Sequence, residues 1–291
     1  MGVIERDPHT GHGTTGHEWN GIKELNTRVP WPVWTFLILT FGFSVVWWIL
    51  MPAWPLGTTY SKGLLGVDVR QVVSASLKSA AEERAAWTSQ IDQKDYAAIQ
   101  ADDALMKDVR ATGHALFGDN CAACHGLAAR GGPGFPNLTD HDWLWGGTPE
   151  AISETIRVGV NSEDPDSRVS QMPPWGSNGA LDRPSLLAVV SYVHSLSHPG
   201  AGADAAQLAA GKEVFAKNCA ACHGPEAKGN PEVGAPDLTD DTWLYGGDLQ
   251  SIYTTVYGGR EGHMPTWQAR LSDTERKILT LYVLDIGKSA P

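Results

Sequence analysis

The chain has 291 residues, of which 33 are acidic and 22 are basic, so its formal net charge is −11. This acidic balance excludes classes of protein that bind nucleic acid or anionic lipid through a basic surface. Apolar residues make up 42% of the chain, and a chain of this length accommodates two small domains and an additional segment. The acidic surface serves either solubility or the docking of a basic partner, and the sequence leaves both open.

An apolar run without a charged residue extends from Val33 to Met51. As a helix it covers roughly 28 Å, close to the hydrocarbon thickness of a bilayer. Prolines flank the run, and tryptophans gather near its ends, where membrane proteins concentrate these rings. The run starts too late for a cleavable signal peptide and is apolar on every face, unlike a surface helix. We therefore predict a transmembrane helix within residues 33–54, preceded by a segment over residues 1–32.

Residues 55–103 are predicted to form a partly helical linker. The sequence from Val67 to Arg110 is rich in Ala, Glu, Gln and Lys, which favour helices with water-facing surfaces. We expect one or two solvent-facing helices ahead of the first domain.

The rest of the chain is an internal duplication. Gly113 opens G-H-A-L-F-G-D-N-C-A-A-C-H-G, and Gly211 opens G-K-E-V-F-A-K-N-C-A-A-C-H-G. An L-T-D-x-x-W-L-x-G-G segment and then a Met-Pro pair follow in each copy. Two copies predict two domains rather than a solenoid, and we place them at residues 104–199 and 204–291. The H-P-G-A-G-A-D stretch between them has linker composition, and an acidic insertion in the first copy predicts a surface loop.

Each repeat predicts the same three helices and no strand of appreciable length. Gly113 and Phe117 share one helix face, as do Gly211 and Phe215, and a glycine there lets another helix approach closely. The fold class is therefore all-α: one N-terminal transmembrane helix followed by two tandem domains. The predicted helices cover residues 104–120, 149–158 and 183–196 in the first repeat, and 206–218, 249–257 and 273–286 in the second.

Each repeat contains C-x-x-C-H, a motif for covalent haem attachment. Two thiols three positions apart form thioethers with the haem vinyl groups, and the adjacent histidine becomes an axial ligand of the iron. Zinc is disfavoured because the cysteine pairs lie too far apart in the chain, and a dithiol redox site lacks its βαβ context. We predict two covalently bound haem c groups. The first is held by Cys121, Cys124 and His125, and the second by Cys219, Cys222 and His223.

The sixth iron ligand is predicted by elimination among five methionines. Met1, Met51 and Met106 precede the haem motifs, so Met172 and Met264 remain. The simplest interpretation pairs Met172 with the first haem and Met264 with the second, but the sequence leaves open whether each methionine serves the haem of the other repeat. A thioether ligand raises the reduction potential and fills the sixth position, which suits electron transfer and not substrate turnover.

Other side chains are alternatives at these sites. Trp143 and Trp243 either donate an indole N–H to a haem propionate or simply pack the haem crevice. The histidines that compete for the sixth position are His141, His194, His198 and His263. His263 is the most serious competitor because it adjoins Met264.

Two further segments flank the apolar run. T-T-G-H-E-W-N-G-I-K-E-L-N begins at Thr14, and P-A-W-P-L-G-T-T-Y-S-K-G-L-L-G begins at Pro52. With the two CxxCH domains and the late Met-Pro motifs, they make the chain resemble, over nearly its full length, subunit III of the cbb3-type cytochrome c oxidases. This family consists of membrane-anchored dihaem cytochromes c. Asn20 and Arg28 depart from the residues usual in that family.

The resemblance implies electron transfer and no catalysis by this chain alone. Electrons would pass from a donor cytochrome c through both haems to a monohaem cytochrome c subunit and then to a haem–copper catalytic subunit, which reduces oxygen and pumps protons. Because CxxCH motifs receive haem outside the cytoplasm, we expect a single-pass protein of the bacterial inner membrane with a cytoplasmic N-terminus and periplasmic haem domains.

Three alternatives share parts of the pattern. One is the dihaem cytochrome subunit of a periplasmic dehydrogenase, and another is a free-standing membrane cytochrome. A dihaem peroxidase needs one haem with an open sixth position, and the presence of both Met172 and Met264 argues against it.

Overall fold

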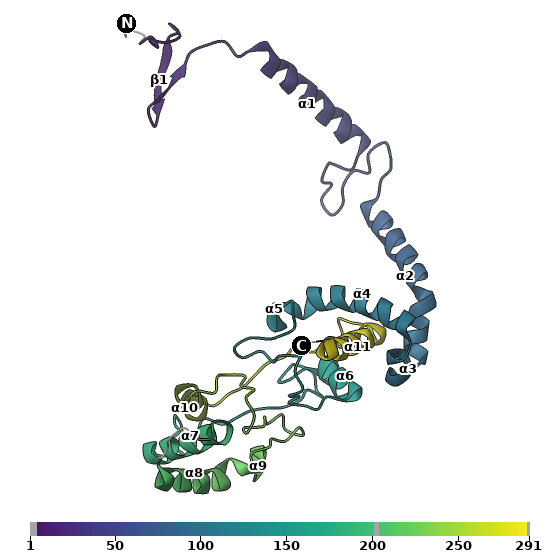
Figure 1. The fold of residues 1–291 in the computed structure, drawn as a ribbon. Helices are drawn as coiled ribbons and strands as arrows, with labels where there is room; N and C mark the ends of the chain where they lie inside the picture. The colour runs from purple at the N-terminus through teal and green to yellow at the C-terminus, as the bar shows by residue number, and fades with distance from the viewer. Residues whose placement is uncertain (1–4, 201–203, 290–291) are drawn as a thin grey trace. The chain divides into compact units, whose positions relative to one another are not determined.

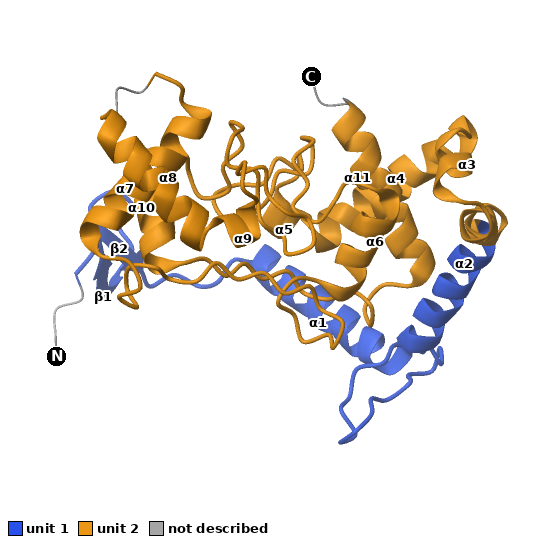
Figure 2. Cartoon of the chain, turned by 90° about the horizontal axis from the view of Figure 1, so that it is seen from below, with its two compact units in different colours: residues 1–83 blue, residues 84–291 orange. Residues whose placement is uncertain are grey.

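The computed structural model describes residues 5–200 and 204–289 and divides into two compact units, residues 1–83 and 84–291 (Figure 2). Helices predominate in both units (Figure 1), as the all-α class predicts. The linker prediction falls partly on residues 201–203, which lie outside the described residues.

The first unit begins with a small hairpin that the sequence analysis did not predict. Strands β1 (Thr14–Trp19) and β2 (Ile22–Leu25) pair antiparallel. Between them Asn20 and Gly21 have φ values of 50° and 86°, the left-handed conformation that a two-residue hairpin turn requires. The Asn-Gly pair was the signal for this turn.

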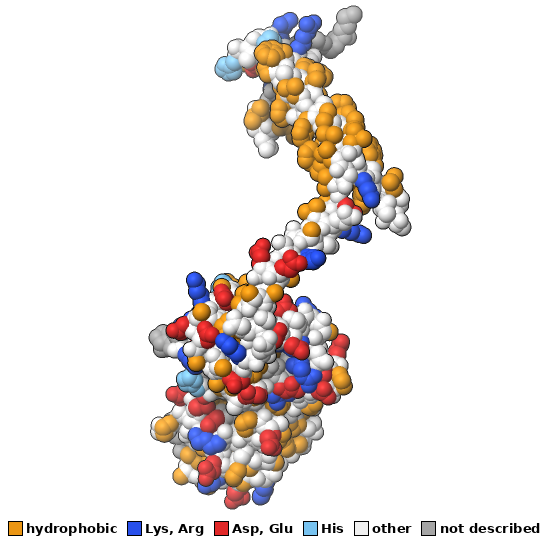
Figure 3. Space-filling view, turned by 90° about the vertical axis from the view of Figure 1, so that its right-hand side faces the viewer, with side chains coloured by type: hydrophobic (Ala, Val, Ile, Leu, Met, Phe, Trp, Pro, Cys, Tyr) orange, Lys and Arg blue, Asp and Glu red, His pale blue; other side chains and the backbone are white. Residues whose placement is uncertain are grey.

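Helix α1 (Trp31–Leu50) matches the predicted transmembrane segment. It begins at a proline-flanked end and contains no buried residue, so apolar side chains surround it, as Figure 3 shows in orange. It is long and apolar enough to cross a bilayer. An apolar helix with no buried side chain is consistent with a membrane anchor.

Helix α2 (Val69–Gln93) spans the boundary between the units, and α3 (Tyr96–Gln100) follows it. The prediction of purely solvent-facing helices is wrong for this stretch. Ile91 and Ile99 are fully buried against Ile278 near the C-terminus, and the Thr274 hydroxyl donates to Asp92 at 2.6 Å. The second half of the predicted linker is therefore part of the second unit.

The remaining helices agree with the predicted ranges to within a few residues. Side-chain caps fix several starts: Thr148 accepts from the Ala151 amide, and Asp182 accepts from the Ser185 amide. The elements are α4 (Asp103–Asn120), α5 (Ala122–His125), α6 (Pro149–Val158), α7 (Arg183–Ser197), α8 (Ala205–Asn218), α9 (Ala220–His223), α10 (Leu249–Gly258) and α11 (Asp273–Ser289).

The two repeats exchange their terminal helices. Helices α4 and α6 pack with α11 of the second repeat, and α8 and α10 pack with α7 of the first (Figure 2). The first core contains Phe117, Ala129, Ile152, Ile156, Trp267, Leu271, Leu279, Tyr282 and Val283. The second core contains Leu186, Val189, Val190, Val193, Phe215, Ala227, Ile252 and Val256. Each core thus draws on both repeats, so a division into residues 104–199 and 204–291 does not describe the packing.

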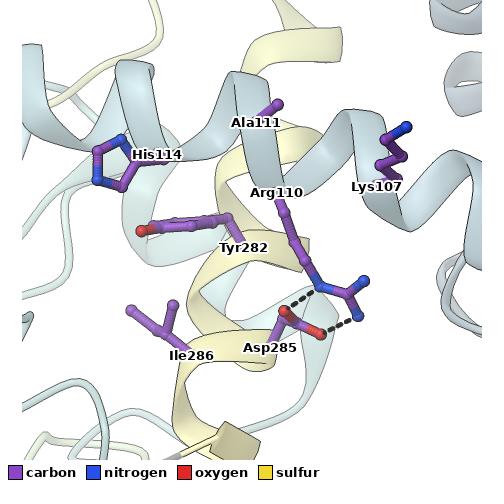
Figure 4. A pocket seen from close by; sticks show the side chains of 7 residues that line it. All are labelled: Lys107, Arg110, Ala111, His114, Tyr282, Asp285 and Ile286. Carbon is purple, nitrogen blue, oxygen red and sulfur yellow. Dashed lines mark hydrogen bonds and ion pairs between the residues drawn. The ribbon is translucent and has the colours of Figure 1, made fainter.

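The two helix glycines mark the exchanged contacts. A Cβ on Gly113 would lie 2.6 Å from the Cβ of Tyr282, and one on Gly211 would lie 2.1 Å from the Ala188 carbonyl oxygen. Figure 4 shows Tyr282 of α11 beneath α4, next to the two hydrogen bonds between Arg110 and Asp285. The predicted close helix approach is confirmed, but each partner helix comes from the other repeat.

The packing of α11 is expected to depend on its apolar face and little on its ion pair. Ile278→Ala removes a buried side chain from the cluster with Ile91 and Ile99 and should lower the free energy of unfolding by about 2–5 kcal/mol. Arg110→Met should change it little, because the Arg110 side chain is 51% exposed and water screens the pair. Thermal denaturation of the full-length protein in detergent measures both, and an equal effect would contradict this view of α11.

Candidate haem centres

Each CxxCH motif forms a one-turn helix directly after a long helix. The Cys121 amide donates to the Phe117 carbonyl at 2.8 Å, and the His125 amide donates to Cys121 at 3.0 Å. Gly126, with a φ of 76°, then ends the turn. Positions three and four apart share a helix face, so both thiols and the imidazole of the motif lie on one side. The second motif, on α9, repeats these hydrogen bonds.

Both motif histidines are held by a backbone carbonyl. Nδ1 of His125 lies 2.9 Å from the Pro136 oxygen, and Nδ1 of His223 lies 3.1 Å from the Pro236 oxygen. A carbonyl accepts only from a protonated nitrogen, so Nε2 carries the free lone pair. Burial lowers the pKa of both imidazoles, although these hydrogen bonds oppose the shift. Each histidine is therefore oriented and favoured in its neutral form, with Nε2 available to bind a metal.

The cysteine thiols are not activated as they would be in a metal–thiolate or dithiol redox site. Burial raises the pKa of Cys121 and of Cys219 to about 11, so neither is a ready thiolate. All four cysteines are free of disulfide bonds. In residues 5–200 and 204–289, no group of three or more His, Cys, Asp or Glu side chains is arranged to hold a metal ion. Thioether attachment, by contrast, needs only free thiols.

The structure places each predicted methionine ligand with the other repeat. Met264 packs against the first core together with Cys121, and Met172 packs against the second core together with Cys219. The pairing of each methionine with the haem of its own repeat does not fit this packing. Met106 is 3% exposed in the cluster with α11, which contains no residue of either CxxCH motif.

Backbone hydrogen bonds hold the crossed arrangement. The amide of Met172 donates to the Arg260 carbonyl at 2.8 Å, and the amide of Arg260 donates to the Met172 carbonyl at 2.9 Å. Met264 and Val160 exchange a second pair, both at 2.9 Å. The Asn161 side chain donates to the Gly262 carbonyl at 2.7 Å. The two methionine loops are thus joined to each other by hydrogen bonds.

The competing histidines differ in their surroundings. His263 is exposed, and its Nδ1 lies 2.9 Å from the Asn161 carbonyl oxygen. His141 is exposed as well. The rings of His194 and His198 stack on each other at 4.3 Å at the end of α7.

Two buried donors near the cores lack a protein acceptor. Trp143 and Trp243 pack on the first and second core respectively. The indole nitrogen of Trp243 and Nε of Arg168 are buried without a hydrogen-bond partner in the part of the chain that the structure describes. Such donors are costly unless another group accepts from them. A haem with its propionates supplies such acceptors, so the residues present fit this group.

Arg168 was missed by the sequence analysis. It lies four residues before Met172, as Arg260 lies four residues before Met264. This repeated spacing could have indicated a functional role for Arg168. It was not used because arginines in an acidic loop are ordinarily solvated.

Comparison with known proteins gives three family matches along the chain. Residues 11–58 match the N-terminal domain of cytochrome oxidase-cbb3, FixP. Residues 110–197 match the cytochrome c family. Residues 206–283 match the family described as cytochrome c oxidase, cbb3-type, subunit III.

Relatives of known name match nearly end to end. The chain is 46% identical to the cbb3-type cytochrome c oxidase subunit FixP of a Bradyrhizobium species, with 97% of each chain covered. It is 43% identical to subunit CcoP of Cereibacter sphaeroides, with 94% of each covered, and 42% identical to CcoP of an Azospirillum species, with 97% of each covered. These relatives do not favour the dehydrogenase alternative. The chain belongs to the FixP/CcoP family of cbb3-type cytochrome c oxidase subunits, which carry two covalent haem c groups and transfer electrons within the oxidase.

Proposed function

We propose that this subunit accepts electrons from a donor cytochrome c and passes them through its two haems to a monohaem cytochrome c subunit. From there they would reach the haem–copper catalytic subunit, where oxygen is reduced. Haem iron supplies the one-electron chemistry at both sites. The chain itself binds and orients these groups and contributes no substrate-binding step of its own.

The observation that carries this proposal is the contact between the two sites inside one compact unit. The loop after the first CxxCH meets the W-L-Y-G-G segment, since the Gly134 amide donates to Leu244 at 2.8 Å. The loop after the second CxxCH meets W-L-W-G-G, where a Cβ on Gly234 would lie 2.4 Å from the Trp145 ring. Two neighbouring haem sites joined by packed protein would provide a route for electrons through the chain.

The ligand sets follow the observed packing. Cys121, Cys124 and His125 hold the first haem, and Met264 supplies its sixth ligand. Cys219, Cys222 and His223 hold the second haem, and Met172 supplies its sixth ligand. The packing of each methionine beside the first cysteine of the motif supports this crossed assignment. Thioether ligands keep both haems at high potential and closed to small molecules.

The orientation follows from where haem is attached. Covalent attachment at CxxCH takes place outside the cytoplasm, so residues 84–291 would lie in the periplasm. Helix α1 would cross the inner membrane once, and the N-terminal hairpin would lie in the cytoplasm. The apolar exposed surface of α1 supports its docking in lipid or against the catalytic subunit.

Purification in mild detergent through a tag on this chain tests the assignment. We expect b-type haem, copper and a monohaem cytochrome c in the sample, with cyanide-sensitive oxygen uptake from reduced cytochrome c. A Cys219→Ala, Cys222→Ala variant is the matched control, because it should keep the partners and lose the uptake. Co-purification of a dehydrogenase without copper or oxygen uptake would contradict the proposal.

A further inference from the structure

Arg168 is a half-buried cation whose Nε is enclosed by protein, and it has no anionic partner among the described residues. Its Nη2 donates to the Ala151 carbonyl at 3.1 Å, while its Nε has no acceptor in the described ranges. Burial lowers the pKa of its guanidinium, and the nearby Glu154 opposes the shift only in part. No ion pair of 4 Å or less is found for Arg168 in the described part of the chain. The buried Nε–H therefore needs an acceptor that the described residues do not supply.

The surroundings of Arg168 belong to the first haem site. Ala151 lies in α6, whose Ile152 and Ile156 line the first core with Cys121. The Arg168 amide donates to the carbonyl of Gly159, directly after α6, at 3.2 Å. Its guanidinium lies over the Trp145 ring at 5.0 Å, two residues after Trp143, which packs on the same core. The cation therefore lies beside residues that would surround the first haem.

The equivalent arginine of the second repeat is satisfied by protein. Arg260 lies over the Tyr245 ring at 4.2 Å, and its Nε and Nη2 both donate to the Thr255 hydroxyl, at 3.0 and 2.9 Å. In the first repeat the matching hydroxyl, on Thr155, donates to Ala151 instead. At the second site the donor without a partner is the indole of Trp243. The two sites thus differ in the charge of their free donor.

We propose that Arg168 binds a propionate of the first haem through its Nε–H, and that its charge raises the reduction potential of this haem alone. The ferric state carries one more positive charge than the ferrous state, so a fixed cation nearby favours reduction. The indole of Trp243 donates to the second haem without adding charge. The inference rests on the proposed attachment of the first haem at Cys121, Cys124 and His125, which the haem count per chain tests separately.

A redox titration of the full-length chain in detergent tests this role. Arg168→Gln should lower the reduction equilibrium constant of the first haem about tenfold, which is about 59 mV for a one-electron couple, if an effective dielectric constant near 20 applies. The second haem should not shift. Arg168→Lys, which keeps the charge, should restore most of the potential. A His125→Gln variant identifies the titration step of the first haem.

Arg130 provides the matched control, since it is an exposed cation five residues after His125. Arg130→Gln removes the same charge from a screened position and should shift the first haem far less. Arg168→Gln overturns the proposal if it shifts the first haem no more than Arg130→Gln does, or shifts both haems equally. If Arg168→Gln fails to take up haem, the Lys variant decides: a potential close to that of the unchanged protein supports the proposal, and a loss as large as tenfold contradicts it.

Discussion

Met264→His should lower the potential of the haem attached at Cys121 and Cys124, although Met264 lies in the other repeat. Histidine in place of a thioether removes the ligand that favours ferrous iron. Met172→His should act in the same way on the haem attached at Cys219 and Cys222. Both effects follow from the packing of each methionine on the opposite core. They are the largest changes in potential that we expect from a single substitution.

Combined variants identify which haem loses its methionine. A Cys121→Ala, Cys124→Ala variant removes the covalent attachment of the first haem. Combined with Met264→His, it should leave one haem with methionine ligation, seen as the absorption band of ferric iron bound to sulfur. Combined with Met172→His, it should leave none. Ligation within each repeat gives the reverse result, and haem content per chain serves as the control.

Gly211→Ala should lower the stability of the second unit, although the same substitution at an unhindered helix glycine normally raises stability. The new Cβ would lie 2.1 Å from a backbone oxygen of α7, at Ala188, and 2.7 Å from the Cβ of Tyr192. The position of a backbone carbonyl inside a helix is fixed by the helix geometry. The clash can therefore be relieved only if α7 and α8 move apart. Overpacking of this kind typically costs about 1–3 kcal/mol, which lowers the unfolding midpoint by roughly 2–4 °C per kcal/mol in a unit of this size.

Gly118 on α4 is the matched control for Gly211. It is also a helix glycine, but a Cβ there meets nothing within 4 Å among the described residues. Gly118→Ala should therefore raise stability, by about 0.5–1 kcal/mol, because alanine favours a helix over glycine. Thermal denaturation followed by haem absorption compares the two variants. Equal effects would show that α7 does not cross α8 at Gly211.

Local chemistry made much of the molecule predictable. The helix bounds follow from capping residues such as Thr148 and Asp182 and from apolar spacing, which act within a few residues. The attachment motifs are equally local, because both thiols and the histidine occupy one helical turn. The Asn20-Gly21 hairpin was also encoded locally, yet its strands are too short to show an alternating pattern.

The contacts of residues 87–109 were not predictable in this way. Ile91 and Ile99 stand among alanines and charged residues that indicate a solvated helix. Their burial depends on α11, which lies at the far end of the chain and offers Ile278 and Leu281. Charge patterns likewise gave no hint that Arg168 is partly shielded from water, because this shielding comes from α6 and Trp145.

The sequence by itself determined that the chain carries two haem c motifs, and it predicted which residues attach each haem and that two methionines serve as sixth ligands. Only the tertiary structure decided which terminal helix packs on which core and beside which motif cysteine each methionine lies. The two repeats have the same apolar spacing and the same glycine contact points, so α7 and α11 fit either core by pattern alone. The short connection from Ser197 to Ala205 keeps α7 beside α8, which leaves α11 to cover α4 and crosses the two methionine loops.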